Sequence, residues 1–146
     1  MSRVIRVDHV AMAVDDLEAS LRFWRDGLGM HVQRTEEIPE QQAVVSFLPT
    51  EQAQIELVQP TDPETGTGRF LTKRGPGVHH ICLEVDHLEP ILARLREQGF
   101  RLINDQPMVG AGGRRMAFVH PESTQGVLVE LYEAPPLAPA SSNEVV

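Results

Sequence analysis

The chain has 146 residues, of which 41% are hydrophobic and 23% charged, values typical of one compact globular domain. Its formal net charge of −8 argues against non-specific binding to nucleic acid, and no apolar run approaches the roughly 20 residues that cross a bilayer, so we expect no nucleic-acid or membrane partner. Cys82 is the only cysteine and excludes an internal disulfide; together with an N-terminus that lacks the apolar stretch of a signal peptide, it indicates a reducing compartment, which we expect to be the cytoplasm.

The first half is predicted to have the order βαβββ. A strand is expected over residues 3–14, followed by a helix for which Asp15 and Glu18 have the spacing of a capping box. Leucines and a tryptophan recur at helical spacing up to Gly29, which is expected to end this helix. Three further strands are expected over residues 30–37, 42–49 and 53–59.

The second half is predicted to repeat this order after a linker. Residues 60–77 are rich in Pro, Gly and Thr, with a short helix expected around Arg69–Lys73. The elements then expected are a strand over 78–85, a helix from about 88 to 98 with Asp86 before it, and strands near 101–103, 114–119 and 126–133. The tail, residues 134–146, is rich in Pro, Ser and Ala and is predicted to be disordered.

These elements predict an α+β fold in which residues 1–133 form a single domain. Two βαβββ modules, residues 3–59 and 78–133, would be related by pseudo-two-fold symmetry. The repeat is visible in the letters, because HVAMAV at residues 9–14 returns as HICLEV at residues 80–85, an offset of 71. Each half also ends in a strand with one acid between apolar residues, Glu56 in the first and Glu130 in the second.

Strand periodicity places one histidine of each half on a cavity wall. His9 shares a strand face with Ala11 and Ala13, and the bulkier opposite face is expected to pack beneath the helix. The same parity selects His80 over its neighbour His79, which falls in the register of bulky residues.

The two histidines and two glutamates together predict a metal centre. A carboxylate in the middle of an inner strand is costly to desolvate unless a positive charge meets it. Each of the four residues alone would more often be an ordinary strand residue, but their matched register favours a shared divalent cation bound by His9, Glu56, His80 and Glu130. This donor set suits Co, Ni, Zn, Mn or Fe, with open positions for water or substrate oxygens.

At this point the chain resembles a known family. Over residues 5–133 it is similar to the methylmalonyl-CoA epimerases of the vicinal oxygen chelate superfamily. The more specific motifs are the double histidine His79-His80 and the glycine loop Gly110-Ala111-Gly112-Gly113 followed by His120-Pro121. The four metal ligands alone are less specific, because glyoxalase I uses a similar set.

The resemblance implies a metal-dependent isomerase that interconverts (R)- and (S)-methylmalonyl-CoA. Proton removal α to the thioester would give an enolate, with Glu56 and Glu130 as the bases on its two faces. Cobalt is the metal we expect first, with zinc, nickel and manganese as alternatives, and we expect a homodimer. Some epimerases carry a further catalytic glutamate on the third strand, where this chain has Val45.

Two groups of residues are candidates for the acyl-CoA substrate. The basic residues best placed for the phosphates of coenzyme A are Arg114 and Arg115 after the glycine loop and Arg69, Lys73 and Arg74 in the linker, although a solvated surface would explain them equally well. Gly112 and Gly113 could present backbone N–H groups to a carboxylate or phosphate, and Ser46 and His120 are further candidates for substrate contact.

Three other functions compete with the epimerase. Glyoxalase I would use the same metal and the same proton chemistry on a glutathione hemithioacetal. A binding module of the same fold that sequesters small molecules would need no metal. A dioxygenase is disfavoured because such enzymes usually surround iron with two histidines and one acid, whereas Glu56 supplies a fourth ligand here.

Overall fold

The computed structural model describes residues 1–110 and 113–136. Eight strands form one mixed sheet in the order β2-β3-β4-β1-β5-β8-β7-β6. Their bounds are β1 Val4–Ala13, β2 Arg34–Ile38, β3 Ala43–Pro49, β4 Gln54–Pro60, β5 Gly77–Val85, β6 Met108–Val109, β7 Arg115–Val119 and β8 Leu128–Glu133.

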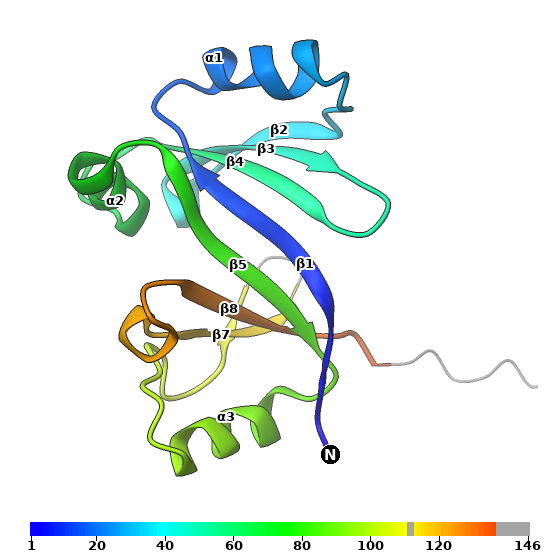
Figure 1. The fold of residues 1–146 in the computed structure, drawn as a ribbon, viewed down its shortest axis with the longest axis vertical. Helices are drawn as coiled ribbons and strands as arrows, with labels where there is room; N and C mark the ends of the chain where they lie inside the picture. The colour runs from blue at the N-terminus through cyan, green and yellow to red at the C-terminus, as the bar shows by residue number, and fades with distance from the viewer. Residues whose placement is uncertain (111–112, 137–146) are drawn as a thin grey trace, which may run out of the picture.

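The two halves of the chain join edge to edge at the centre of this sheet. β1 pairs antiparallel with β5, while β4 runs parallel to β1 and β8 runs parallel to β5. Figure 1 shows β1 and β5 crossing the middle of the molecule, with β2–β4 on one side and β7 and β8 on the other. The halves therefore pair within one chain, and the predicted α+β fold of two related modules is confirmed.

The helices cover the outer side of each half, as the bulky strand faces predict. Leu17 and Leu21 of α1 (Leu17–Leu21) belong to the same apolar cluster as Leu57, with Met12 of β1 packed against it. α3 (Leu88–Glu97) buries Leu88, Ile91 and Leu92 against Val85, Ala117, Val119 and Leu131. Figure 1 shows α1 and α3 at opposite ends of the molecule.

Helix starts differ from the predicted caps. The side chain of Asp16, and not that of Asp15, accepts a hydrogen bond from the backbone N–H of Ala19 at 3.1 Å. α1 continues as a π-helical turn over Arg22–Gly27, and the chain then turns at Gly29 with a φ of 72°, a conformation that glycine adopts at little cost. The backbone N–H of Leu88, the first residue of α3, donates a hydrogen bond to Glu133 at 2.7 Å. The carboxylate of Asp86 instead accepts hydrogen bonds from the hydroxyl of Ser2 and the backbone N–H of Arg3.

Three other elements depart from the predicted bounds. The strand expected near 101–103 is only an isolated bridge between Leu102 and Val119, and the outer strand of this half is the short β6. β2 begins at Arg34, four residues later than expected. The linker helix α2 is longer than predicted, Gly66–Arg74, because Thr65 caps its first turn. Residues 137–146 of the predicted disordered tail lie outside the described residues.

The inner face of the sheet carries the candidate site. In the first half this face holds a small apolar cluster of Ala11, Ala43, Val45, Phe47 and Val58.

No helix within residues 1–110 and 113–136 is long and apolar enough to cross a membrane.

Candidate metal centre

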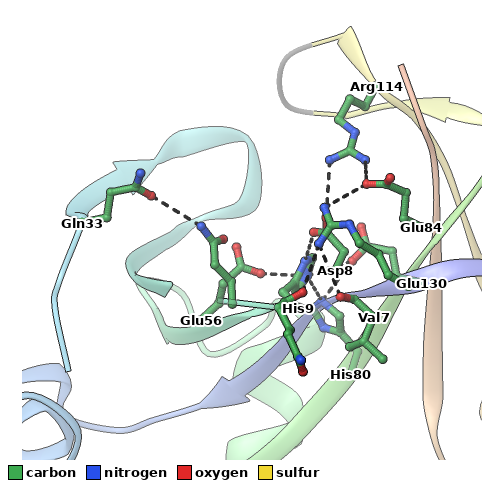
Figure 2. Close-up of polar contacts among 12 residues, drawn as sticks. Val7, Asp8, His9, Gln33, Glu56, His80, Glu84, Arg114 and Glu130 are labelled. Atoms are coloured by element: carbon green, nitrogen blue, oxygen red, sulfur yellow. Dashed lines mark hydrogen bonds and ion pairs between the residues drawn. The ribbon is translucent and has the colours of Figure 1, made fainter. Parts of the chain in front are cut away.

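The four residues predicted to share a cation converge on one point of the inner face. They come from four neighbouring strands: Glu56 from β4, His9 from β1, His80 from β5 and Glu130 from β8. His9 Nε2 lies 2.7 Å from Glu56 Oε2, 3.3 Å from Glu130 Oε2 and 3.2 Å from His80 Nε2. His80 Nε2 lies 3.1 Å from Glu130 Oε2. Figure 2 shows Glu56 and Glu130 on opposite sides of His9.

Strand register explains this convergence. Cys82 of β5 is the Cα partner of both His9 and Glu130, so these two side chains flank it on the same face of the sheet. Glu56 is opposite Ala11 of β1 and Phe47 of β3, both on the inner face. Alternation along each strand then keeps the bulky apolar neighbours on the outer face.

The site is buried and highly charged. Only 3% of Glu130 and 4% of His9 are exposed to solvent. Burial alone would raise the pKa of Glu130, but hydrogen bonds from His80 and His9 outweigh it and lower that pKa to about 2. Burial would also lower the pKa of His9, yet hydrogen bonds with Asp8, Cys82, Glu130 and Glu56 raise it well above its usual range.

A β-bulge places a polar partner behind each of the two histidines. The pairing of β1 with β5 skips Asp8 on one strand and His79 on the other, the residues directly before His9 and His80. Asp8 Oδ2 accepts a hydrogen bond from His9 Nδ1 at 2.8 Å, and His79 Nδ1 lies 2.9 Å from His80 Nδ1. Burial and the neighbouring His80 lower the pKa of His79 to about 4, so His79 is neutral at pH 7.

This arrangement fits a divalent cation. A histidine that donates its Nδ1–H to a carboxylate presents a lone pair on Nε2, the orientation found in metal-ligating histidines. In His9 the raised pKa means that Nε2 carries a proton facing the carboxylates of Glu56 and Glu130, and a metal ion would take the place of that proton and supply the positive charge instead. The ligand atoms of His9, His80 and Glu130 all lie within 4.8 Å of one another. The carboxylate of Glu56 is next to this group, with its Oε2 2.7 Å from Nε2 of His9. The set can therefore hold a divalent metal ion.

Two arginines form ion pairs with the acids beside the two histidines. Arg6 donates to Asp8 and Glu84 at 3.0 Å each, and Arg114 donates to Glu84 at 3.0 Å while its guanidinium lies 4.6 Å from the Tyr132 ring centroid. The described partners of Arg114 are these groups beside the metal centre (Figure 2), and its contact with substrate stays a prediction.

Sequence reasoning missed the supporting groups Asp8, Glu84 and Arg6. Glu84 shares a strand face with His80, so its position was visible in the alternation of β5. The place of Asp8 depends on the bulge, which period-two alternation does not predict.

Two residues expected to contact substrate lie away from the inner face of the sheet. Ser46 is fully buried on the opposite face of β3 from Val45 and Phe47, and its hydroxyl lies 2.6 Å from that of Thr35. Arg115 points to the outer face, where it forms ion pairs with Glu89 of α3 and Glu133 of β8. Strand alternation explains both positions, because the neighbouring residues Val45 and Arg114 are the ones that face inward.

The remaining predicted contacts stay predictions. Nδ1 of His120 accepts a hydrogen bond from the backbone N–H of Glu122 at 3.1 Å and so caps the short 3₁₀ turn Pro121–Thr124 (η4). Gly113 is exposed, with a φ of 74° that favours glycine. Gly112 lies outside the described residues.

Comparison with known proteins agrees with this geometry. A sequence model of the Glyoxalase/Bleomycin resistance protein/Dioxygenase superfamily matches residues 8–118. The chain belongs to this superfamily. It is 38% identical, over 86% of its own length and 96% of the relative's, to an ethylmalonyl-CoA/methylmalonyl-CoA epimerase of Cereibacter sphaeroides.

Solved structures give the same result. A methylmalonyl-CoA epimerase from Mycobacterium tuberculosis superposes with a TM-score of 0.81 at 37% identity, covering 91% of this chain and 90% of that one. A Streptomyces coelicolor methylmalonyl-CoA epimerase in complex with 2-nitronate-propionyl-CoA also has a TM-score of 0.81, at 33% identity over 94% of this chain and 100% of that one. The resemblance to methylmalonyl-CoA epimerases that the motifs carry is thereby confirmed.

Proposed function

We propose that this protein is a metal-dependent epimerase that interconverts (R)- and (S)-methylmalonyl-CoA. The observation that carries the proposal is the buried cluster of two histidines and two glutamates, in a chain similar to epimerases over most of its length. The reaction removes the proton at the carbon between the thioester and the carboxylate and returns it to the other face of the planar enolate.

The two carboxylates suit this reaction because they flank the cluster from different modules. Glu56 and Glu130 lie on opposite sides of His9 (Figure 2), so a substrate held between them would meet one carboxylate on each face. In this proposal one takes the α-proton while the other, in its acid form, returns a proton to the opposite face. Glu130 is held ionised by His9 and His80, a state in which it can accept a proton.

The other acids near the cluster are engaged elsewhere. Asp8 and Glu84 are paired with Arg6, and Glu84 also with Arg114, which leaves them as supports for the site. Val45, at the position where some epimerases carry a glutamate, is 2% exposed on the inner face and cannot move a proton. These facts support the assignment of both proton transfers to Glu56 and Glu130.

His9, Glu56, His80 and Glu130 would hold the metal ion. When bound, a divalent cation supplies the positive charge that stabilises the negative oxygens of the enolate. Asp8 and His79 orient the two imidazoles, and burial of the cluster keeps bulk water from competing for the same positions. We expect cobalt first, with zinc, nickel or manganese as alternatives, since mixed imidazole and carboxylate donors suit these ions.

The test is exchange of the α-proton. Purified protein, with its metal content measured, is incubated with methylmalonyl-CoA in heavy water, and deuterium at carbon 2 is followed by NMR. Metal-dependent exchange far above the background supports the proposal. Absence of exchange in metal-loaded protein refutes it.

The same assay separates the two rivals. Turnover of the methylglyoxal–glutathione hemithioacetal without exchange in methylmalonyl-CoA would identify a glyoxalase I activity. Protein that binds neither added cobalt nor zinc and turns over neither compound would indicate a binding module.

We also propose a homodimer located in the cytoplasm. The four candidate ligands come from one chain, so the metal centre itself does not require a second copy. Light scattering on the purified protein measures the oligomeric state, and a monomer at micromolar concentration would contradict this expectation.

A further inference from the structure

Four charged side chains beside His9 form a closed ring of alternating sign. This charge ring consists of Arg6, Asp8, Glu84 and Arg114. Nη2 of Arg6 donates hydrogen bonds to Oδ1 of Asp8 and to Oε2 of Glu84, at 3.0 Å each. Nη2 of Arg114 donates to the same oxygen of Glu84 at 3.0 Å, and its Nη1 lies 3.7 Å from Oδ1 of Asp8. Figure 2 shows Arg114 and Glu84 next to Asp8 and His9.

The charge ring joins the two modules of the chain. Arg6 and Asp8 belong to β1, Glu84 belongs to β5, and Arg114 directly precedes β7. Arg6 and Glu84 are Cα partners in the pairing of β1 with β5, so their side chains meet across the two central strands. The guanidinium of Arg114 is held over the ring of Tyr132 at 4.6 Å. Glu84 accepts from both arginines through one oxygen and is therefore the residue that holds them together.

Asp8 depends on this ring because the backbone does not fix its direction. The ladder between β1 and β5 skips Asp8, and a bulge residue is left unpaired by the neighbouring strand. The orientation of its carboxylate is therefore set by side chains. Oδ1 of Asp8 faces the two arginines of the ring, and Oδ2 lies 2.8 Å from Nδ1 of His9. With Oδ1 held in this way, Oδ2 is turned toward the imidazole.

The duplication of the chain does not explain the ring. At the offset of 71 residues, Arg6 corresponds to Gly77 and Glu84 corresponds to Ala13, neither of which carries a charge. The charge ring therefore supports His9 alone, and the second module does not repeat it at the equivalent positions. It is a feature of one candidate metal ligand and not a by-product of the repeated fold.

We propose that Glu84 is a positioning residue for the metal ligand His9. Glu84 binds both arginines so that they face Oδ1 of Asp8, and Asp8 in turn holds the imidazole with Nε2 directed at the metal centre. Within the described residues the side chain of Glu84 is bonded to Arg6 and Arg114 and to none of the four candidate ligands, so it acts through these partners. The inference rests on the proposed function only for the metal ion that His9 would bind.

The experiment compares two substitutions that change the charge in opposite directions, Glu84→Gln and Arg6→Gln. Cobalt affinity is measured by competition with a chromophoric chelator, which needs no substrate, and circular dichroism with thermal melting checks that each variant is folded. The matched controls are Glu122→Gln and Arg101→Gln. These two residues form an exposed ion pair at 3.0 Å and have no hydrogen bond with the four candidate ligands.

The two substitutions separate positioning from the electric field at the site. If charge alone mattered, loss of a carboxylate would weaken the binding of a cation and loss of a guanidinium would strengthen it. A positioning role predicts that both substitutions weaken it, because either one opens the ring. We expect a loss of about tenfold for Glu84→Gln, the lower end for outer partners of a metal-ligating histidine. For Arg6→Gln, whose side chain is 45% exposed, we expect about threefold, as for a partly exposed ion pair. Both controls should bind cobalt as wild type does.

A second measurement reports on His9 in the absence of metal. In protein labelled with heavy nitrogen in its histidines, the Nδ1–H that donates to Asp8 should give a downfield proton resonance, identified by its absence in Asp8→Ala. This resonance should move upfield in Glu84→Gln and in Arg6→Gln, because the hydrogen bond weakens when Asp8 is free to turn. It should stay in place in both controls, and a role of Glu84 in stability alone would leave it unmoved.

A double variant tests whether Glu84 acts through Asp8. Asp8→Ala combined with Glu84→Gln should bind cobalt as weakly as Asp8→Ala alone, because the ring then has no carboxylate left to orient. Losses that add would mean that Glu84 acts by another route, and they would overturn the proposal.

The remaining outcomes separate this role from the proposed function. Glu84→Gln with wild-type cobalt affinity, or Arg6→Gln with unchanged or tighter binding, overturns the positioning role. If both variants lose affinity and move the His9 resonance but the wild type does not exchange the α-proton of methylmalonyl-CoA, the role of Glu84 stands and the proposed function fails. If metal-dependent exchange proceeds while both variants bind cobalt as wild type does, the function stands and the role of Glu84 fails. A wild type that binds no metal ion overturns both.

Discussion

The hydrogen bond from His9 to Asp8 makes a quantitative prediction about metal affinity. Asp8 Oδ2 lies 2.8 Å from His9 Nδ1 and fixes the tautomer that leaves Nε2 free for a metal ion. Asp8→Ala removes this acceptor, so His9 can rotate or present the wrong nitrogen. Loss of such a partner typically weakens metal binding about ten- to hundredfold, or about 1.4–2.7 kcal/mol. Asp8→Asn keeps an oxygen acceptor and should lose less.

The assay is a competition titration of cobalt or zinc against a chromophoric chelator, which needs no knowledge of the substrate. Asp26→Ala is the control, because Asp26 also forms an ion pair with an arginine, Arg25 at 2.8 Å, but on the exposed surface of the turn after α1. The control should bind metal as wild type does. The reasoning about Asp8 would be refuted by an Asp8→Ala protein that is folded and binds metal with unchanged affinity.

Three further results are expected. His80→Ala should abolish metal binding and activity, whereas His79→Ala should mainly lower the unfolding temperature; the reverse pattern in a metal titration would show that the ligand is assigned to the wrong histidine. Glu130→Gln should reduce kcat more than metal affinity if the carboxylate moves a proton, and equal losses would make it only a ligand. The backbone N–H of Arg3, together with Ser2 and His87, forms hydrogen bonds that lower the pKa of Asp86 from 3.8 to about 2. The ionised carboxylate therefore stabilises the fold above pH 3.8, and this stabilisation is lost as the pH falls through about 2. Thermal melts should show Asp86→Asn less stable than wild type at pH 7 and equal to it near pH 2; a constant difference would contradict this linkage.

Much of the fold and the proximity of the four candidate ligands could be predicted from the sequence. The repeat at an offset of 71 residues places His9 and His80 on equivalent strands, and period-two alternation gives the face on which each imidazole and each carboxylate lies. The strand register that these patterns predict is kept in the fold, because a shift of one residue in any of these strands would turn its polar side chains into the outer core. The roles of the four residues as ligands remain predictions for the metal titrations.

What could not be predicted depends on long-range contacts. The bulges at Asp8 and His79 exist only because β1 pairs with β5 across the two modules. The start of α1 moved by one residue because Asp16 and not Asp15 reaches the N–H of Ala19. Ser46 is a candidate substrate contact in the sequence, but alternation along β3 turns it toward the outer core.

The antiparallel pairing of β1 with β5 also bears on how the molecule melts. A duplicated chain could consist of two halves that open separately, but here the central strand of each half is hydrogen-bonded to that of the other. Peeling one half away would break this ladder and expose the inner apolar faces of both. We therefore expect calorimetry to record a single cooperative transition. The candidate ligands come from both halves, so a bound ion would link the two halves and raise the midpoint temperature of that single transition.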